Sequence, residues 1–130
     1  MSSHNNNTTA TTTTTKNEYS DHVFFFDIDN TLYPQSSGIG DMMADRIRKY
    51  CVLRMGMTEE AAAKASKKYY LDYGLAIRGL LKHHSVSPVD YDEFVDGGLP
   101  LDSILAPNKP LREMILRIKT RRWVFTNAGM

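Results

Sequence analysis

Two short apolar runs lie near the two ends of the chain, and each of them ends in polar residues. The first covers residues 23–26 and leads into Asp27-Ile28-Asp29, and the second covers residues 123–125 and leads into Thr126. Continuous rather than alternating hydrophobicity is typical of a strand covered on both faces, as in a parallel sheet. We therefore predict two parallel strands, each followed by polar side chains.

Between the two runs, apolar residues recur at helical spacing. The positions that predict a first helix, over about residues 39–55, are Ile39, Met43, Ile47, Tyr50 and Cys51. Thr58 is suited to cap a second helix that runs to about residue 73, where Gly74 ends or bends it. A third helix is predicted over residues 75–82, and Asp90 could cap a short fourth one through residue 95.

The stretch that follows Pro110 is the most clearly amphipathic in the chain. Its apolar positions, spaced i, i+3, i+4 and i+7, are Leu111, Met114, Ile115 and Ile118. A helix here, with Pro110 in its first turn, would complete a strand–helix–strand crossover back to the first strand. The predicted fold class is therefore α/β, with the helices between about residues 40 and 105 as an inserted all-helical module.

The N-terminal segment has a different composition. Residues 2–17 contain Ser, Thr or Asn at 13 of 16 positions, so they can bury almost no apolar surface. Nothing would offset the entropy lost on ordering such a stretch, and we expect a disordered tail over residues 1–20.

Charge and cysteine content exclude several classes of protein. The 130 residues carry 16 Lys and Arg against 15 Asp and Glu, a net charge of +1, which argues against nucleic acid or an anionic membrane as partner. No apolar run approaches the ~18 residues of a spanning helix. The single cysteine, Cys51, excludes an intramolecular disulfide and a cysteine-based zinc cluster. We expect a cytoplasmic location, with the nucleus also open, and we expect Cys51 in the core.

Asp27 and Asp29 are the candidate catalytic residues. Residues i and i+2 of an extended strand share a face, so both carboxylates could point toward one ligand. The carboxyl end of a parallel strand is also where open α/β sheets bind their ligands. Phosphoryl transfer needs a nucleophile, a proton donor and a hard cation. In a pair of carboxyl groups, one can act as the nucleophile, the other can donate the proton, and both can bind the cation. The alternative is that these residues only end a strand and begin a turn.

The wider sequence resembles the haloacid dehalogenase-like hydrolases. Residues 24–33, FFFDIDNTLY, resemble the DxDxT signature of that superfamily, and residues 124–127, VFTN, resemble its second motif, an apolar strand that ends in Thr or Ser. The resemblance covers residues 22–130 and implies a partial Rossmann-like core. Within this resemblance, the Asp at position 29 favours a phosphatase over a dehalogenase, because a dehalogenase does not need to protonate an alkoxide leaving group.

The resemblance implies a role for each matching residue. Asp27 would be the nucleophile that forms an aspartyl-phosphate and would also bind Mg²⁺. Asp29 would be the general acid and base, and its main-chain carbonyl would be the second Mg²⁺ ligand. Thr126 would hydrogen-bond the transferring phosphoryl group, with Asn127 beside it.

A finer resemblance, to the pyrimidine 5′-nucleotidases of fungi and plants, rests on three further stretches. These are DIDNTLYP at residues 27–34, the tyrosines at 69, 70 and 73, and LPL at residues 99–101. It implies a first strand and catalytic loop over residues 21–37, a helical cap over 38–108, and a core helix with the second strand over 109–130. The implied substrate is a pyrimidine nucleoside monophosphate or a related small phosphomonoester. No oligomeric state follows.

Two motifs of the family, a Lys and an acidic pair, would lie beyond Met130. We therefore expect this chain to be a truncated half of the enzyme, with little or no phosphatase activity and marginal stability. The alternative is a non-catalytic binding module derived from such a phosphatase. The tyrosines at 69, 70 and 73 could stack on a nucleobase or pack between helices, and His83 and His84 are expected at a solvated helix end.

Overall fold

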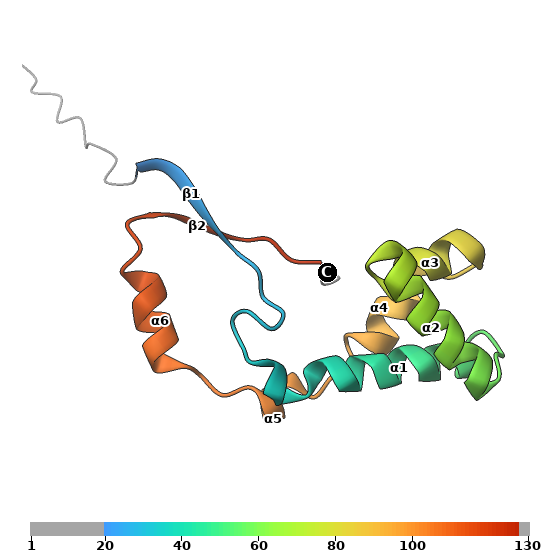
Figure 1. Cartoon of the computed structure of the whole chain (residues 1–130). Coiled ribbons are helices and arrows are strands. Elements are labelled where there is room, and N and C mark those ends of the chain that lie inside the picture. Colours follow the sequence, from blue (N-terminus) through green and yellow to red (C-terminus); the bar gives the residue numbers. More distant parts are fainter. Residues whose placement is uncertain (1–19, 128–130) are drawn as a thin grey trace, which may run out of the picture.

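The computed structural model describes residues 20–127 and has a mixed α/β architecture (Figure 1). The elements are β1 (Ser20–Phe26), the 3-10 helix η1 (Gln35–Ser37), α1 (Ile39–Leu53), α2 (Glu59–Tyr73), α3 (Ala76–His83), α4 (Pro88–Val95), α5 (Leu101–Ile104), α6 (Lys109–Leu116) and β2 (Thr120–Val124). The predicted tail lies outside the described residues except for Ser20, where β1 begins. The fold class predicted from the sequence is confirmed.

The two strands form a two-stranded parallel sheet (Figure 1). The paired residues are Val23 with Arg121, Phe24 with Arg122, Phe25 with Trp123 and Phe26 with Val124. The second strand begins at Thr120, earlier than the apolar run at residue 123 predicts. Its first residues pair because the ladder uses backbone groups, and charged side chains such as Arg121 can stand on an exposed sheet face.

The buried core lies in the helical region. Its buried members, which come from α1, α2, α3 and α4, are Tyr50, Cys51, Ala62, Leu80, Tyr91 and Val95. Helix α1 packs against α2 and α4, and α2 packs against α3. Cys51 is fully buried, as its place on the apolar face of its helix predicted.

Local capping explains where α2 begins and ends. The Thr58 hydroxyl accepts the N–H of Ala61 at 3.2 Å, which satisfies one of the free donors of the first turn. At the other end Gly74 adopts φ 77°, a left-handed conformation that glycine takes without steric cost. Both predictions for this helix are confirmed.

The cap of α4 differs from the prediction. Ser87, rather than Asp90, is the N-cap, and its hydroxyl accepts the N–H of Asp90 at 3.4 Å. Pro88 at the helix start has a backbone φ suited to the first turn, so the helix begins there. Asp90 then lies inside the first turn, where a carboxylate favours the positive end of the helix dipole.

The sheet is much more exposed than the helical core. Phe25 and Trp123 are 54% and 55% exposed, and α6 has no buried residue. The expected cover on both faces of the strands is therefore absent within residues 20–127, because no helix there packs extensively against β1 or β2. In the same part of the chain, no helix combines the length and the apolar character needed to cross a membrane.

Candidate active site

The two candidate carboxylates lie in a turn just after β1. The strand ends at Phe26, and the carbonyl of Ile28 accepts the N–H groups of Thr31 at 3.2 Å and of Leu32 at 3.0 Å. Asn30 has φ 55°, a left-handed conformation that Asn tolerates better than most residues. The turn, and not the alternation of an extended strand, therefore sets where the carboxylates point.

Thr31 links the first carboxylate to the backbone of the second. Its hydroxyl donates to Asp27 Oδ2 at 3.2 Å and lies 3.5 Å from the main-chain oxygen of Asp29. The Asp27 carboxylate and the Asp29 carbonyl thus converge on one small group. They are the two oxygens that the family resemblance implies as Mg²⁺ ligands.

This pair of oxygens fits a hard cation. Mg²⁺ binds through one or two carboxylates, with waters and substrate oxygens completing its octahedron. Among residues 20–127 no group of three or more His, Cys, Asp or Glu side chains could hold a metal ion. The described chain would therefore supply only part of the coordination shell, through Asp27 and the carbonyl of Asp29.

The Asp29 side chain has a different partner. The Tyr33 hydroxyl donates to Asp29 Oδ1 at 2.5 Å, across four residues of the same turn. Burial, the hydrogen bond to Asp29 and the negative charges of Asp29 and Asp27 together raise the pKa of Tyr33 to about 12. The Tyr33 hydroxyl therefore keeps its proton near neutral pH and donates a hydrogen bond to Asp29. Sequence reasoning missed this role, for which the i, i+4 spacing from Asp29 was the available signal.

The end of the second strand lies at the same edge of the sheet. The N–H of Phe125 donates to the carbonyl of Phe26 at 2.8 Å, so the pairing continues one residue beyond β2. Phe26 immediately precedes Asp27, and Phe125 immediately precedes Thr126. The structure therefore brings the predicted residues of both strand ends to one sheet edge.

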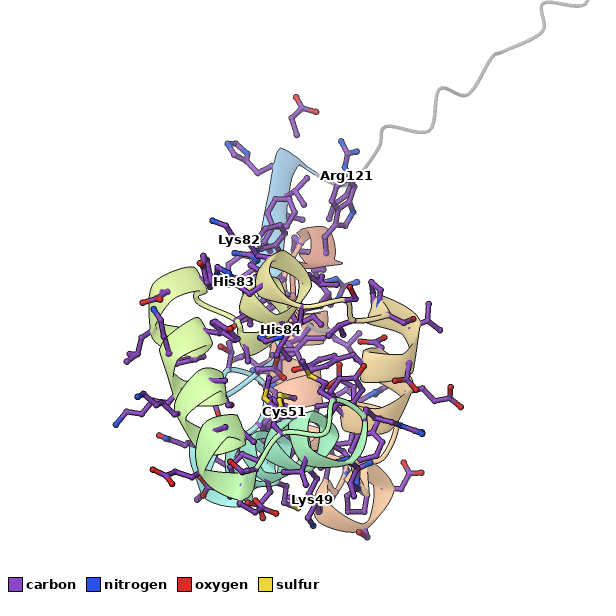
Figure 2. The ribbon with its side chains drawn as sticks, turned by 90° about the vertical axis from the view of Figure 1, so that its right-hand side faces the viewer. Lys49, Cys51, Lys82, His83, His84 and Arg121 are labelled. Atoms are coloured by element: carbon purple, nitrogen blue, oxygen red, sulfur yellow. The ribbon has the colours of Figure 1, made fainter. Side chains whose placement is uncertain are left out.

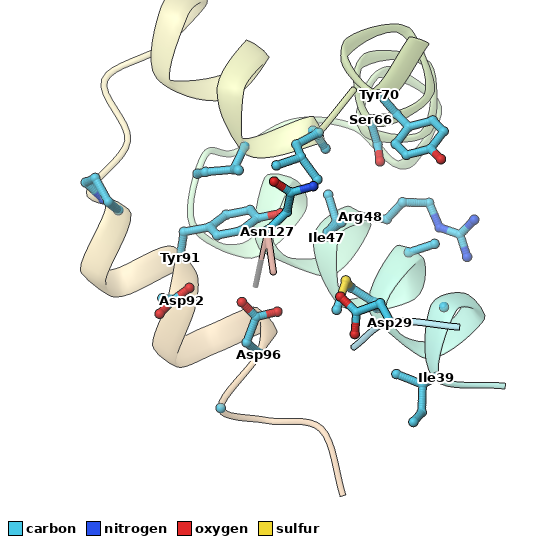
Figure 3. A pocket seen from close by; sticks show the side chains of 18 of the residues that line it. Asp29, Ile39, Ile47, Arg48, Ser66, Tyr70, Tyr91, Asp92, Asp96 and Asn127 are labelled. Carbon is cyan, nitrogen blue, oxygen red and sulfur yellow. The ribbon is translucent and has the colours of Figure 1, made fainter. Parts of the chain in front are cut away.

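A cleft of about 1240 Å³ lies between this edge and the helices. Asp29, Asn30, Tyr33 and Asn127 line one side of it, whereas Asp27 is not among its lining residues. Helices α1, α2, α3 and α4 line most of the rest, and Figure 3 labels several side chains of α1, α2 and α4, including Ile47, Arg48, Ser66, Tyr70, Tyr91 and Asp92. A mainly apolar wall with a few polar groups is typical of a small-molecule site.

The three tyrosines of α2 have two different environments. Tyr70 lines the cleft and is 62% exposed, so its ring is accessible to a ligand. Tyr69 and Tyr73 turn toward α3 instead. Their hydroxyls form hydrogen bonds with Nε2 of His84 at 2.9 Å and Nε2 of His83 at 2.7 Å, respectively. These two histidines, labelled in Figure 2, are thus bonded to α2 and not simply solvated.

Comparison with known proteins relates the chain to phosphate metabolism. No protein-family model matches the chain. Over 114 residues the chain is 35% identical to Phosphate metabolism protein 8 of Saccharomyces cerevisiae, and the alignment covers 82% of this chain and 36% of that protein. The chain thus spans about a third of the length of this curated relative. It is a distant homologue of a protein named for phosphate metabolism.

Proposed function

We propose that the chain carries the nucleophile and the general acid of a Mg²⁺-dependent phosphomonoester hydrolase of the haloacid dehalogenase type. The observation that carries the proposal is the convergence of the Asp27 carboxylate and the Asp29 carbonyl on Thr31, at the carboxyl end of β1. The end of β2 lies at the same edge, and Asn127 lines the adjoining cleft. Homology to a phosphate metabolism protein supports this class of chemistry.

The proposed reaction has two steps. An Asp27 oxygen attacks the phosphorus atom, the bond from phosphorus to the leaving oxygen breaks, and Asp29 gives its proton to that oxygen. A water molecule, losing a proton to Asp29, then attacks the phosphorus of the aspartyl-phosphate and releases inorganic phosphate and the Asp27 carboxylate. Thr126 and Asn127 would donate hydrogen bonds to the phosphoryl oxygens. A bound Mg²⁺ would offset the negative charge of the phosphate.

The proposed substrate is a pyrimidine nucleoside monophosphate. The cleft extends from Asp29 to the exposed ring of Tyr70, which could stack on a nucleobase. Arg48 and Lys67 also line the cleft and could contact a charged ligand. The preference for pyrimidines rests on the family resemblance, so the assay must include purine nucleotides.

The test is phosphate release by the longest form of the protein that cells make. We expect release from uridine and cytidine monophosphate in the presence of Mg²⁺, less from adenosine and guanosine monophosphate, and none after chelation of the metal. Asp27→Asn is expected to abolish release. Asp21→Asn, the same change at an exposed residue of β1, is the matched control and should leave release unchanged. Undiminished release by Asp27→Asn would refute the proposal.

A second candidate, a non-catalytic nucleotide-binding module, is favoured by one observation. All the buried residues of the described chain lie between Ile39 and Val95, so the helical region has a core of its own. This candidate predicts that calorimetry detects binding of uridine monophosphate by the wild-type protein, with no phosphate release. Turnover that depends on Asp27 would exclude it.

A further inference from the structure

The hydrogen bond between Tyr33 and Asp29 links the proposed general acid to a residue with no assigned role. The phenol donates to Oδ1 of the carboxylate at 2.5 Å, and both side chains line the cleft. A donor on Oδ1 restricts the rotation of the planar carboxylate group. The direction in which Oδ2 points is then set as well. We propose that Tyr33 is a positioning residue, which aims Oδ2 of Asp29 at the leaving oxygen of the substrate. This inference rests on the proposed function.

The backbone around the turn holds Tyr33 in place. The carbonyl of Ile28 accepts two N–H groups of the turn, and Asn30 reverses the chain with its positive φ. Pro34 follows Tyr33 directly, and a residue before proline is restricted to extended conformations. The phenol is therefore presented from a constrained backbone, which lowers the entropy cost of holding Asp29.

The turn holds the two carboxylates separately. Asp27 is bonded by the Thr31 hydroxyl, and Asp29 by the Tyr33 hydroxyl, each across four residues. A nucleophile must face the phosphorus atom, whereas an acid must face the leaving oxygen on the far side of it. Two independent hydrogen bonds let one turn keep the two orientations distinct.

Placement matters for the acid because proton transfer acts over a short range. A general acid must come within about 2.6–3.2 Å of the atom that it protonates, and a misplacement of about 1 Å can cost 100-fold in rate. The loss should depend on the leaving group. A nucleoside 5′-oxygen leaves as a poor alkoxide and needs the proton, whereas p-nitrophenolate leaves readily without it.

The experiment compares Tyr33→Phe with the wild type, both in the longest form of the protein that cells make, on uridine monophosphate and on p-nitrophenyl phosphate. We expect kcat for the nucleotide to fall about 10- to 100-fold, since general acid catalysis contributes about 100- to 10,000-fold and the acid itself is retained. On the aryl phosphate kcat should change less than about threefold, and KM should be little changed for either substrate. Tyr33→Gln retains an N–H donor and should restore part of the nucleotide rate.

Tyr73→Phe is the matched control, because it removes a phenol that bonds His83 and does not line the cleft. It should leave the ratio of the two rates unchanged. An equal loss on both substrates in Tyr33→Phe, or no loss on the nucleotide, would overturn the inference. Should Tyr33→Phe not fold, the same ratio measured in Tyr33→Leu, which also lacks a hydrogen-bond donor, decides, since a ratio below that of the wild type supports positioning and an unchanged ratio opposes it.

The two proposals fail in different ways. Activity that survives Asp27→Asn on both substrates removes the proposed function itself. Activity that is lost in Asp27→Asn, but shows no change of substrate ratio in Tyr33→Phe, removes only the role of Tyr33.

Discussion

Gly79→Ala is expected to destabilise the protein, although alanine is the better helix former. Gly79 is buried in α3, where it faces the ring of Tyr69 on α2. A Cβ atom at this position would lie 2.2 Å from Tyr69 Cγ and 2.4 Å from Tyr69 Cβ. Carbon atoms in contact normally lie about 3.5–4.0 Å apart, so the ring or the helix would have to move by more than about 1 Å.

The size of the effect follows from three contributions to the free energy of unfolding. The higher helix propensity of alanine stabilises the protein by about 1 kcal/mol. Overpacking at the Gly79–Tyr69 contact costs about 1–3 kcal/mol. Displacement of the ring also breaks the hydrogen bond between Tyr69 and His84, which costs about 1 kcal/mol. The net loss is therefore about 1–3 kcal/mol.

The assay is urea unfolding followed by far-UV circular dichroism. Gly40→Ala in α1 is the matched control, since a Cβ there would meet nothing within 4 Å, and it should leave the protein unchanged or up to about 1 kcal/mol more stable. In a Tyr69→Gly background, Gly79→Ala should no longer be destabilising, because both the ring and the Cβ atom that the new methyl group would meet are gone. A Gly79→Ala protein as stable as the wild type would refute the reasoning.

Four further results are expected. Leu80→Ala, at a fully buried site of the helical core, should cost about 2–5 kcal/mol in urea unfolding. Arg46→Met should cost about 1–3 kcal/mol in the same assay, because Arg46 Nε donates to the carbonyls of Phe94 and Val95 at 2.9 Å and caps the end of α4. Burial raises the pKa of Tyr91 above its unfolded value of about 10, so its contribution to stability is complete below that pH and is lost as the pH rises further. Tyr91→Phe should therefore flatten the alkaline fall in stability, measured by urea titrations between pH 8 and 11. Burial also raises the pKa of the Cys51 thiol, so a thiol reagent should label it only as urea unfolds the protein, and fast labelling of the native state would contradict its burial.

The features that were predicted correctly depend on short stretches of sequence. The ends of α2 follow from Thr58 and Gly74, because capping involves only the adjacent turn. The position of Cys51 in the core follows from helical periodicity. The start of β2 at Thr120 does not follow from nearby residues, because strand pairing is decided by a partner backbone far away in the sequence.

The candidate site was predictable in its location but not in its internal bonding. Two apolar runs that end in polar residues indicate a shared sheet edge, and the strands do end there. The link between Tyr33 and Asp29 depends on a turn with a left-handed residue at Asn30. Residue types alone do not determine such a turn. The sequence was equally compatible with an extended strand through Asp29, which would have placed the two carboxylates differently.

The separation of core and sheet along the chain has a consequence for the order of folding. The contacts of the helical core all lie within residues 39–95, whereas Phe26 pairs with Val124, about 100 residues away in the chain. Closing a flexible loop of that length costs about 4 kcal/mol in chain entropy, and local contacts form faster than distant ones. The helices should therefore assemble first. Their assembly shortens the flexible chain between the two strands and so lowers the entropy cost of pairing them. Pulsed hydrogen exchange during refolding should then protect the amides of α1 before those of β1, so the site at the strand ends would be the last part of the molecule to form.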